Sequence, residues 1–437
     1  GLEDQSGGAD LISEQYSASR YFHVERTFSE FFLSAYGADG GAATNQEFQD
    51  QGASVTHANK CQDCHMEDVI GKGADSSDAP LRPTESTEHP NSGGPLHNFQ
   101  GGNSWITQIL ASVDADNDAT YDVENANLLL GRSNVLTLDM TQGYVPGEKS
   151  MTNALVAGSA RAINQLSLAA TIKNAVYDPT TGGLSFRLLN NTGHKLISGY
   201  PEGRRMWVNI KAYNNGSLLY EVNPYDSAAG TLKGLGYHYT TAETELPFPA
   251  GLTASEVYSE ELVYETHMKS SLTGEEKTFH FVLADGRDKD NRIPPKGFDV
   301  ETAHIRKSEP VEDGESDPDL FLNPEYDGGY DLVNMTIQSG ADQVDITVYY
   351  QGTSREYVEF LRDEINGLGR CSTTMGIACG GDGDCPGDET CIKTLTEPTY
   401  AYANYLNPDQ DPAYLAQTDD FFDGLTEWGN TIWDLWK

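Results

Sequence analysis

The chain has 437 residues, enough for two or three domains with their own cores, so neither a metal nor a disulfide is required merely to make it fold. Hydrophobic residues make up 38% of it and aromatic residues 10%, while 44 Gly, 19 Pro and 23 Tyr favour strands and turns over a helical bundle. The formal charge of −39 argues against nucleic acid as a partner, and no stretch approaches the ~18 apolar residues that span a bilayer.

Residues 1–165 are predicted to form a mostly irregular and helical domain. Helical patches cover residues 21–36 and 104–113, and long polar loops separate them. Because such a region contains little regular structure, we expect it to be organised around a cofactor.

The run Cys61-Gln62-Asp63-Cys64-His65 is a CxxCH sequence, the pattern that attaches c-type haem. Two thiols three positions apart can reach the two vinyl groups of the porphyrin, and the next residue places an imidazole under the iron. We therefore predict one haem c, held by Cys61, Cys64 and His65. The alternative is a disulfide between the two cysteines beside an incidental histidine.

The sixth iron ligand decides between an electron carrier and an enzyme, because a filled position blocks substrate while a vacant one admits peroxide or small molecules. Of the ten histidines, His97 is the first choice, since a loop about 30 residues after the haem motif can fold back over the haem. His194 is the second choice. The remaining candidates are His89, His23 and Met66.

A calcium site is an open alternative in the acidic stretch that begins at residue 114. Oxygen-bearing side chains alternate there as they do in an EF-hand loop, and Ala119 and Asn125 depart from that motif, which has Gly and Glu at these positions. An acidic, solvated loop is the preferred interpretation. The calcium candidates are Asp114, Asp116, Asp118, Thr120 and Asp122.

Residues 166–352 are predicted to form an antiparallel β-sandwich domain, because short runs with period-two alternation are separated by turn residues. Asn214-Asn215-Gly216, between two such stretches, predicts a β-hairpin. The runs are LSLAATIKNAVY, LSFRLLN, MWVNIKAYNNGSLLYEV, KTFHFVLAD and VDITVYY.

Residues 353–437 are predicted to begin with a helix over 353–366 and to continue into a Cys-rich stretch with almost no apolar residues. Such a stretch needs covalent links to hold its shape, so we expect two disulfides in an oxidising compartment, with three possible pairings. A zinc site is the rival interpretation, although no pair of these cysteines has CxxC spacing. The cysteines are Cys371, Cys379, Cys385 and Cys391.

A C-terminal helix is predicted from about Asp420. Its apolar residues repeat at helical spacing and form one face, which we expect to dock on the protein's own core. These residues are Leu425, Trp428, Ile432 and Trp436.

Several segments together resemble the multihaem c-type cytochromes of metal-reducing and sulfur-cycling bacteria. The resemblance spans most of residues 57–366 and implies a secreted electron-transfer protein with a haem-bearing N-terminal part, a β-domain, and histidines on both sides of the iron, His65 at the proximal position and His97 at the distal one. Relatives usually carry several CxxCH motifs, whereas this chain has one. The segments are KCQDCHMEDVIGKG, EHPNSGGPLHNFQGGNSW, NNTGHKLISGYPEGRRMWVNIKAY, DKDNRIPPKGF and YYQGTSREYVEFLRDEI.

We therefore expect an α+β protein that acts as an electron carrier at the cell surface, in the periplasm or outside the cell, with other cytochromes or redox proteins as partners. No basic and then hydrophobic presequence precedes Gly1, so we expect a mature, soluble product. Two alternatives remain: a structural surface protein that assembles into oligomers or filaments with a haem relay, and a haem enzyme such as a peroxidase or reductase with an open iron.

Overall fold

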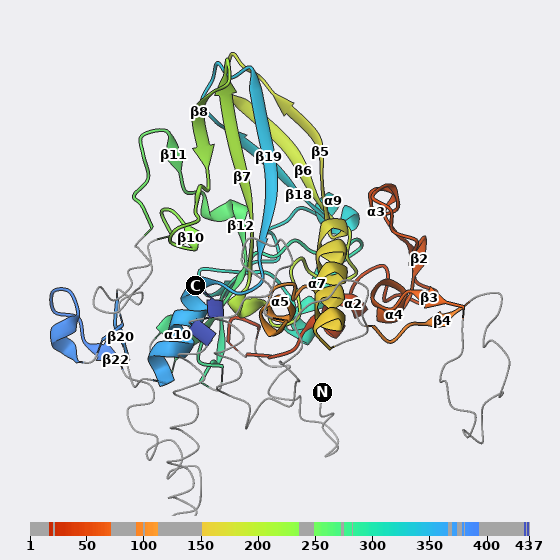
Figure 1. The fold of residues 1–437 in the computed structure, drawn as a ribbon, viewed down its shortest axis with the longest axis horizontal. Coiled ribbons are helices and arrows are strands. Elements are labelled where there is room, and N and C mark those ends of the chain that lie inside the picture. The colour runs from red at the N-terminus through yellow and green to blue at the C-terminus, as the bar shows by residue number, and fades with distance from the viewer. Residues whose placement is uncertain are drawn as a thin grey trace, which may run out of the picture.

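The computed structural model describes residues 17–20, 22–70, 93–98, 101–111, 151–235, 249–271, 275–281, 283–365, 369–373, 378–379, 381–392, 432–433 and 435–436. The fold is α+β, as predicted. Long antiparallel strands stand together at one end, and the helices and short hairpins gather around their base (Figure 1).

Two antiparallel sheets form the main body. In one sheet the long strand β7 pairs with β19 along one edge and with β8 and then β12 along the other, while β11 adds to β8 in parallel. In the second sheet β6 lies between β5 and β18. The bounds are β5 (Ala170–Tyr177), β6 (Gly183–Asn190), β7 (Arg205–Asn214), β8 (Ser217–Val222), β11 (Glu256–Val257), β12 (Val263–Tyr264), β18 (Tyr330–Thr336) and β19 (Gln343–Gln351).

One hydrophobic core joins these two sheets. Alternate residues of β6, such as Phe186 and Leu188, and of β7, such as Val208 and Ile210, are buried in it together. The other face of β7 is buried too, where Trp207 packs with the side chains around Leu232. The period-two alternation of the sequence therefore corresponds to real strands, and β7 reads as a continuous buried run because it is covered on both sides.

A third sheet has the strand order β14-β13-β15-β16-β17, and short hairpins and 3₁₀ turns connect it to the body. Its strands carry many of the charged side chains discussed below. The bounds are β9 (Tyr225–Asp226), β10 (Thr231–Leu232), β13 (Thr266–Ser270), β14 (Glu275–Thr278), β15 (Gly286–Asp290), β16 (Val311–Glu312), β17 (Glu315–Ser316), α8 (Val300–Ala303), α9 (Asn323–Gly328), η1 (Pro201–Gly203), η2 (Glu260–Leu262) and η3 (His304–Arg306).

The N-terminal part contains short helices and two-residue strands, which lie beside the long helix α7 at the base of β5 and β6 (Figure 1). The predicted helical patches at 21–36 and 104–113 correspond to the shorter helices α2 and α5. The bounds are α2 (Thr27–Phe32), α3 (Gln46–Asp50), α4 (Cys61–His65), α5 (Ile106–Leu110), α7 (Met151–Leu168), β1 (Ala42–Ala43), β2 (His57–Ala58), β3 (Asp68–Val69) and β4 (Gly94–Pro95).

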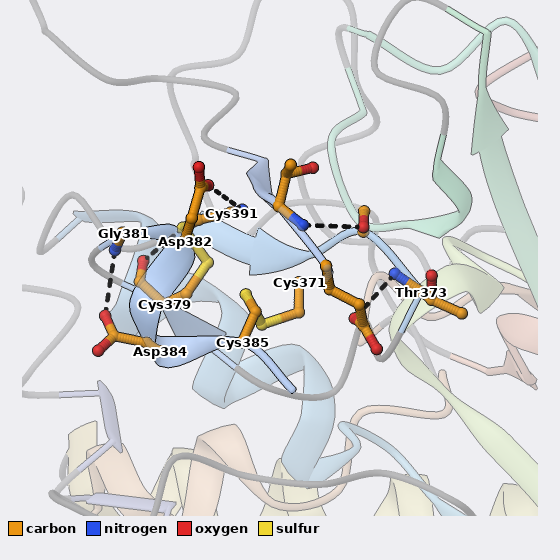
Figure 2. Close-up of a disulfide and its surroundings, with 11 residues drawn as sticks. Cys371, Thr373, Cys379, Gly381, Asp382, Asp384, Cys385 and Cys391 are labelled. Atoms are coloured by element: carbon orange, nitrogen blue, oxygen red, sulfur yellow. Dashed lines mark hydrogen bonds between the residues drawn. A yellow bond between two sulfur atoms is a disulfide. The ribbon is translucent and has the colours of Figure 1, made fainter. Parts of the chain in front are cut away.

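The Cys-rich segment forms a small three-stranded sheet with the order β21-β20-β22, on the side of the molecule away from α4 (Figure 1). Two disulfides, Cys371–Cys385 and Cys379–Cys391, cross it side by side (Figure 2). This finding selects one of the three possible pairings. The bounds are α10 (Arg355–Ile365), β20 (Gly369–Cys371), β21 (Ala378–Cys379), η4 (Asp382–Asp384) and β22 (Cys391–Ile392).

The hairpin at Asn214-Asn215-Gly216 is confirmed, since Asn214 pairs with Ser217 and both central residues have positive φ, the requirement of a tight hairpin turn. The predicted helix over 353–366 is confirmed as α10. None of the described helices is long and apolar enough to cross a membrane.

Two predicted strands are only partly correct. The run LSLAATIKNAVY begins as the last turn of α7, and its strand starts at Ala170, so the expected domain boundary at 165/166 falls inside a helix. The run KTFHFVLAD keeps strand structure only as far as Thr278. The chain then turns because Phe279 and His280 pack against Tyr357 and Phe360 instead of continuing the ladder.

Candidate functional site

The CxxCH motif forms the single helical turn α4. The side chain of Asp63 accepts hydrogen bonds from the backbone N–H groups of Asn59 and Lys60, at 2.9 and 3.2 Å, and so caps the start of this turn. Cys61 and Cys64 lie three positions apart, on the same side of the turn, and are not joined to each other. The alternative of a disulfide between them therefore gains no support from the structure.

Helix α4 forms one wall of a cavity of about 590 Å³. This volume lies within the ~300–1,000 Å³ that is typical of pockets for small molecules and cofactors. Cys61, Cys64 and His65 line it, and most of the remaining wall is apolar, with Phe31 and Phe48 among its aromatic side chains. The site therefore combines an apolar interior with two thiols and an imidazole.

The opposite wall comes from the loop after β6, which carries His194. The loop is fixed by two buried amides: Asn190 donates from Nδ2 to the carbonyl oxygens of His194 at 2.8 Å and Ile293 at 3.0 Å, and Asn191 donates to the carbonyl of Leu168 at 3.0 Å. The sequence NNTGH thus places a histidine over the cavity from the rim of the β-body. Residues far apart in the chain meet at this site.

The rings of His65 and His194 lie close together and nearly parallel, with 6.3 Å between ring centroids and 13° between ring planes. Two imidazoles that ligate one metal ion through bonds of ~2 Å, each with a ring radius of roughly 1.1 Å, have their centroids about 6 Å apart. The observed separation therefore matches two histidines that share one iron between them.

Hydrogen bonding leaves one nitrogen of His194 available for a metal. Its Nδ1 lies 2.9 Å from the carbonyl oxygen of Lys195, so we assign the proton to Nδ1 and the lone pair to Nε2. Burial lowers the pKa of His194, and the positive charge of Arg292 adds to this effect against the pull of Glu30. The ring therefore stays neutral, as a ligand must be.

A buried network of charges lies behind the His194 loop. Glu30 of α2 receives Arg292 Nη2 at 2.7 Å, the backbone N–H of Lys195 at 3.2 Å and the hydroxyl of Ser198 at 3.0 Å. Asp290 of β15 holds Arg292 through two bonds of 2.8 Å. This network ties α2, the His194 loop and β15 together.

The network keeps its carboxylates ionised. Burial alone would raise the pKa of Glu30, but Arg292, Lys195 and Arg26 outweigh burial and hold that pKa below its usual value. The same balance holds the pKa of Asp290 well below its usual range. Since charges are rarely buried, sequence alone gave no reason to place these residues at the site. The only available signal was that Lys195, Asp290 and Arg292 fall within segments that carry the cytochrome resemblance.

The other ligand candidates lie elsewhere. His97 is exposed just after β4, and it does not line the cavity, whereas His194 does. His23 is exposed as well, and Met66 is partly buried at the end of α4 but outside the cavity wall. His89 lies outside the described residues.

Two further metal sites were considered from the sequence, a calcium site and a zinc site. All five calcium candidates of the acidic stretch lie outside the described residues. Three of the C-terminal cysteines come close enough to share a metal, but they are occupied as disulfides. Figure 2 shows that neighbouring acids bind backbone N–H groups instead: Asp382 accepts from Cys391 at 2.7 Å, and Asp384 accepts from Gly381 at 3.1 Å.

Known proteins show little similarity to this chain. No family model and no curated protein sequence matches the chain. Among solved structures, a penta-heme cytochrome c552 from Thermochromatium tepidum aligns with 73% of this chain and 45% of its own, at 12% identity and a TM-score of 0.28. The chain thus spans less than half of that protein, and a likeness this distant carries no argument about fold or function.

Proposed function

We propose that the chain is an extracytoplasmic electron-transfer protein that carries one covalent haem c. Cys61 and Cys64 attach the haem, and His65 and His194 ligate its iron from opposite sides. The observation that carries this proposal is the pair of nearly parallel imidazoles, with ring centroids 6.3 Å apart, in an apolar cavity beside two free cysteines. The proposal replaces His97 by His194 as the distal ligand.

The residues of the chain suit electron transfer better than catalysis. A bound haem would supply one-electron cycling between Fe(III) and Fe(II). His65 and His194 would both hold its iron, which leaves no site there for a substrate. The apolar wall excludes water, and the Nδ1 hydrogen bond of His194 fixes the orientation of that ring. The protein thus provides ligands, burial and geometry rather than acid or base groups.

The two disulfides support a location outside the cytoplasm, because such bonds form and persist in oxidising compartments. Redox proteins are the partners that this function needs. Self-assembly into oligomers or filaments remains a prediction from the sequence alone.

The first test of the function is haem attachment. A denaturing gel of the wild-type protein should stain for haem, and the double variant Cys61→Ala, Cys64→Ala should not. A double variant that still stains would contradict attachment at CxxCH.

The second test compares two histidine variants. Wild-type protein should show six-coordinate, low-spin iron, and His194→Ala should become high-spin and bind carbon monoxide readily. His97→Ala is the matched control, an exposed histidine, and should stay low-spin. His194→Met should remain six-coordinate with a higher reduction potential, which guards against misfolding of the Ala variant. The reverse behaviour of the two Ala variants would restore His97 as the ligand, and a high-spin wild type would favour an enzyme with an open iron.

A further inference from the structure

Besides its cysteines and histidines, the cavity wall contains few side chains that are charged or can titrate. Two of them, Glu25 and Lys60, lie at the rim of the cavity. Glu25 is exposed and accepts a hydrogen bond from the backbone of Thr27, and the side chain of Lys60 is 61% exposed beside Asp63. The remaining charged or titratable side chains of the wall are Tyr36, Arg204 and Tyr350.

Arg204 is the cation that the structure holds away from the rim. It lies between η1 and β7 and is partly buried, and its Nη1 donates to the carbonyl oxygen of Ser198 at 3.2 Å. No carboxylate within the described ranges forms an ion pair with it. Since a guanidinium has five N–H donors, Arg204 retains donors for a ligand in the cavity.

Tyr350 of β19 brings a hydroxyl to the same place. Its Oη is buried beside the Arg204 guanidinium, which can donate to it, and its own O–H has no acceptor among the residues that the structure describes. Burial raises the pKa of Tyr350, and the charge of the neighbouring Arg204 counteracts that rise. The two side chains therefore form a polar pair in a wall that is otherwise mostly apolar.

The backbone at Gly102 leaves room for this pair. A Cβ atom there would lie 3.0 Å from Tyr350 Oη, closer than most side chains approach, and 3.5 Å from Arg204 Nη1, an ordinary contact distance. Glycine at this position thus allows the chain to close over the polar pair without filling the space in front of it.

A carboxylate fits these donors. A buried hydroxyl proton without an acceptor costs free energy, and the Arg204 guanidinium has donors beyond the one that binds Ser198. A carboxylate can accept from the planar fork of an arginine and from a hydroxyl together. We propose that Arg204 and Tyr350 bind a propionate carboxylate of the haem. This inference rests on the proposed function, because it requires haem in the cavity.

The position of the pair agrees with the shape of the porphyrin. The vinyl groups that react with cysteines and the propionates lie toward opposite edges of the ring. In the described structure Cys64 neighbours Tyr36, whereas Arg204 neighbours Ser198 and Tyr350. A haem attached at the cysteines would therefore turn its propionates toward the part of the cavity farthest from them, which is where the proposal expects Arg204 and Tyr350.

The test measures the reduction potential of the holoprotein against pH. A propionate paired with Arg204 stays ionised, so this carboxyl group should add no pH dependence to the wild-type reduction potential between about pH 5 and 8. In Arg204→Gln the propionate pKa should rise into that range. At low pH the reduction potential of the variant should equal that of the wild type, because a protonated propionate beside glutamine has the same net charge as the ion pair. As pH rises and the propionate ionises, the reduction potential of the variant should fall below that of the wild type. Tyr350→Phe should show a smaller shift in the same direction.

Arg187→Gln is the control, because Arg187 is an exposed residue of β6 outside the cavity and its loss changes the total charge equally. Arg204→Lys keeps the charge and should stay closer to the wild type, which separates the charge from general disruption. Curves of Arg204→Gln and wild type that coincide at every pH, with haem attached, would overturn this inference and leave the proposed function intact. If adding acetate at constant ionic strength shifts the wild-type reduction potential, Arg204 and Tyr350 bind acetate from solution and not a propionate. This result would also overturn the inference.

Discussion

Glu30 is fully buried at the point where α2, the His194 loop and β15 meet. Removing one partner of a buried ion pair leaves the other charge without compensation, at a cost of about 3–5 kcal/mol. We therefore expect Glu30→Gln to lower the free energy of unfolding by about that amount, measured by urea denaturation at pH 7. Glu47→Gln is the control, since Glu47 pairs with the part-exposed Lys173 and such surface pairs contribute about 0–1 kcal/mol. Equal losses in the two variants would contradict the role of Glu30.

The same residue makes stability depend on pH. The pKa values of Glu30 and Asp290 are lower in the folded protein than in the unfolded chain, so their contribution is fully present above about pH 5 and is lost as pH falls below about 4. Glu30→Gln should therefore lose less stability than the wild type between pH 7 and about pH 3. The same urea experiment at the two pH values measures this difference.

At the level of single residues, the sequence predicted the haem-attachment motif of the site but not its second histidine ligand. Spacing alone identified Cys61, Cys64 and His65, because their chemistry is local. The choice of His97 over His194 rested on distance along the chain. The structure instead brings His194 to His65 through a β-strand and a loop fixed by buried amides, which are long-range contacts that no local pattern records.

Among the secondary-structure elements, strands and turns with strong local signals were predictable. The Asn-Gly hairpin and α10 lie where the sequence places them, because turn residues and helical periodicity act locally. The run KTFHFVLAD was overestimated, since aromatic packing on α10 bends its second half out of the sheet. Tertiary packing overrides β-propensity in this case.

The C-terminal segment is an element whose docking is visible at four residues, 432–433 and 435–436. Trp433 is 4% exposed, and the guanidinium of Arg362 on α10 lies 4.5 Å from the centre of its ring. Trp436 donates from Nε1 to the carbonyl of Thr353 at 3.2 Å and packs over Gly230. Of the predicted apolar face, Trp436 makes such contacts and Ile432 is half-buried, while Leu425 and Trp428 lie outside the described residues. Trp433, the most buried of the described residues in this segment, was not part of the predicted face.

Trp433→Ala should therefore destabilise the protein by about 3 kcal/mol, the usual cost of removing a buried tryptophan side chain. Urea denaturation measures the loss, and earlier proteolysis of the C-terminal segment should accompany it. Val176→Ala is the control, because Val176 is 63% exposed on β5 and its truncation should change stability by less than about 0.5 kcal/mol. If Trp433→Ala were as stable as this control, the segment would not be docked in solution.

For the molecule as a whole, the chain carries a net charge of −39. Nine basic and ten acidic side chains are buried among the described residues, so the interior charges almost cancel and the excess of acids remains outside. Composition predicted the sign of this field. It could not predict that so many charges would pair in the interior, where they fix the architecture around His194.

The last prediction concerns electron transfer to small redox partners. A negative surface attracts a cationic acceptor over about one Debye length, which shrinks from ~30 Å at 0.01 M salt to ~3 Å at 1 M. The bimolecular rate with a cationic acceptor should therefore fall at least about tenfold between these salt concentrations, since steering acts on the rate of encounter. Stopped-flow mixing of the reduced holoprotein measures this rate. A neutral acceptor should show no such fall, and an anionic acceptor should react faster as salt rises. If the cationic acceptor gave the same rate at every salt concentration, the charge would serve solubility and not the approach of partners.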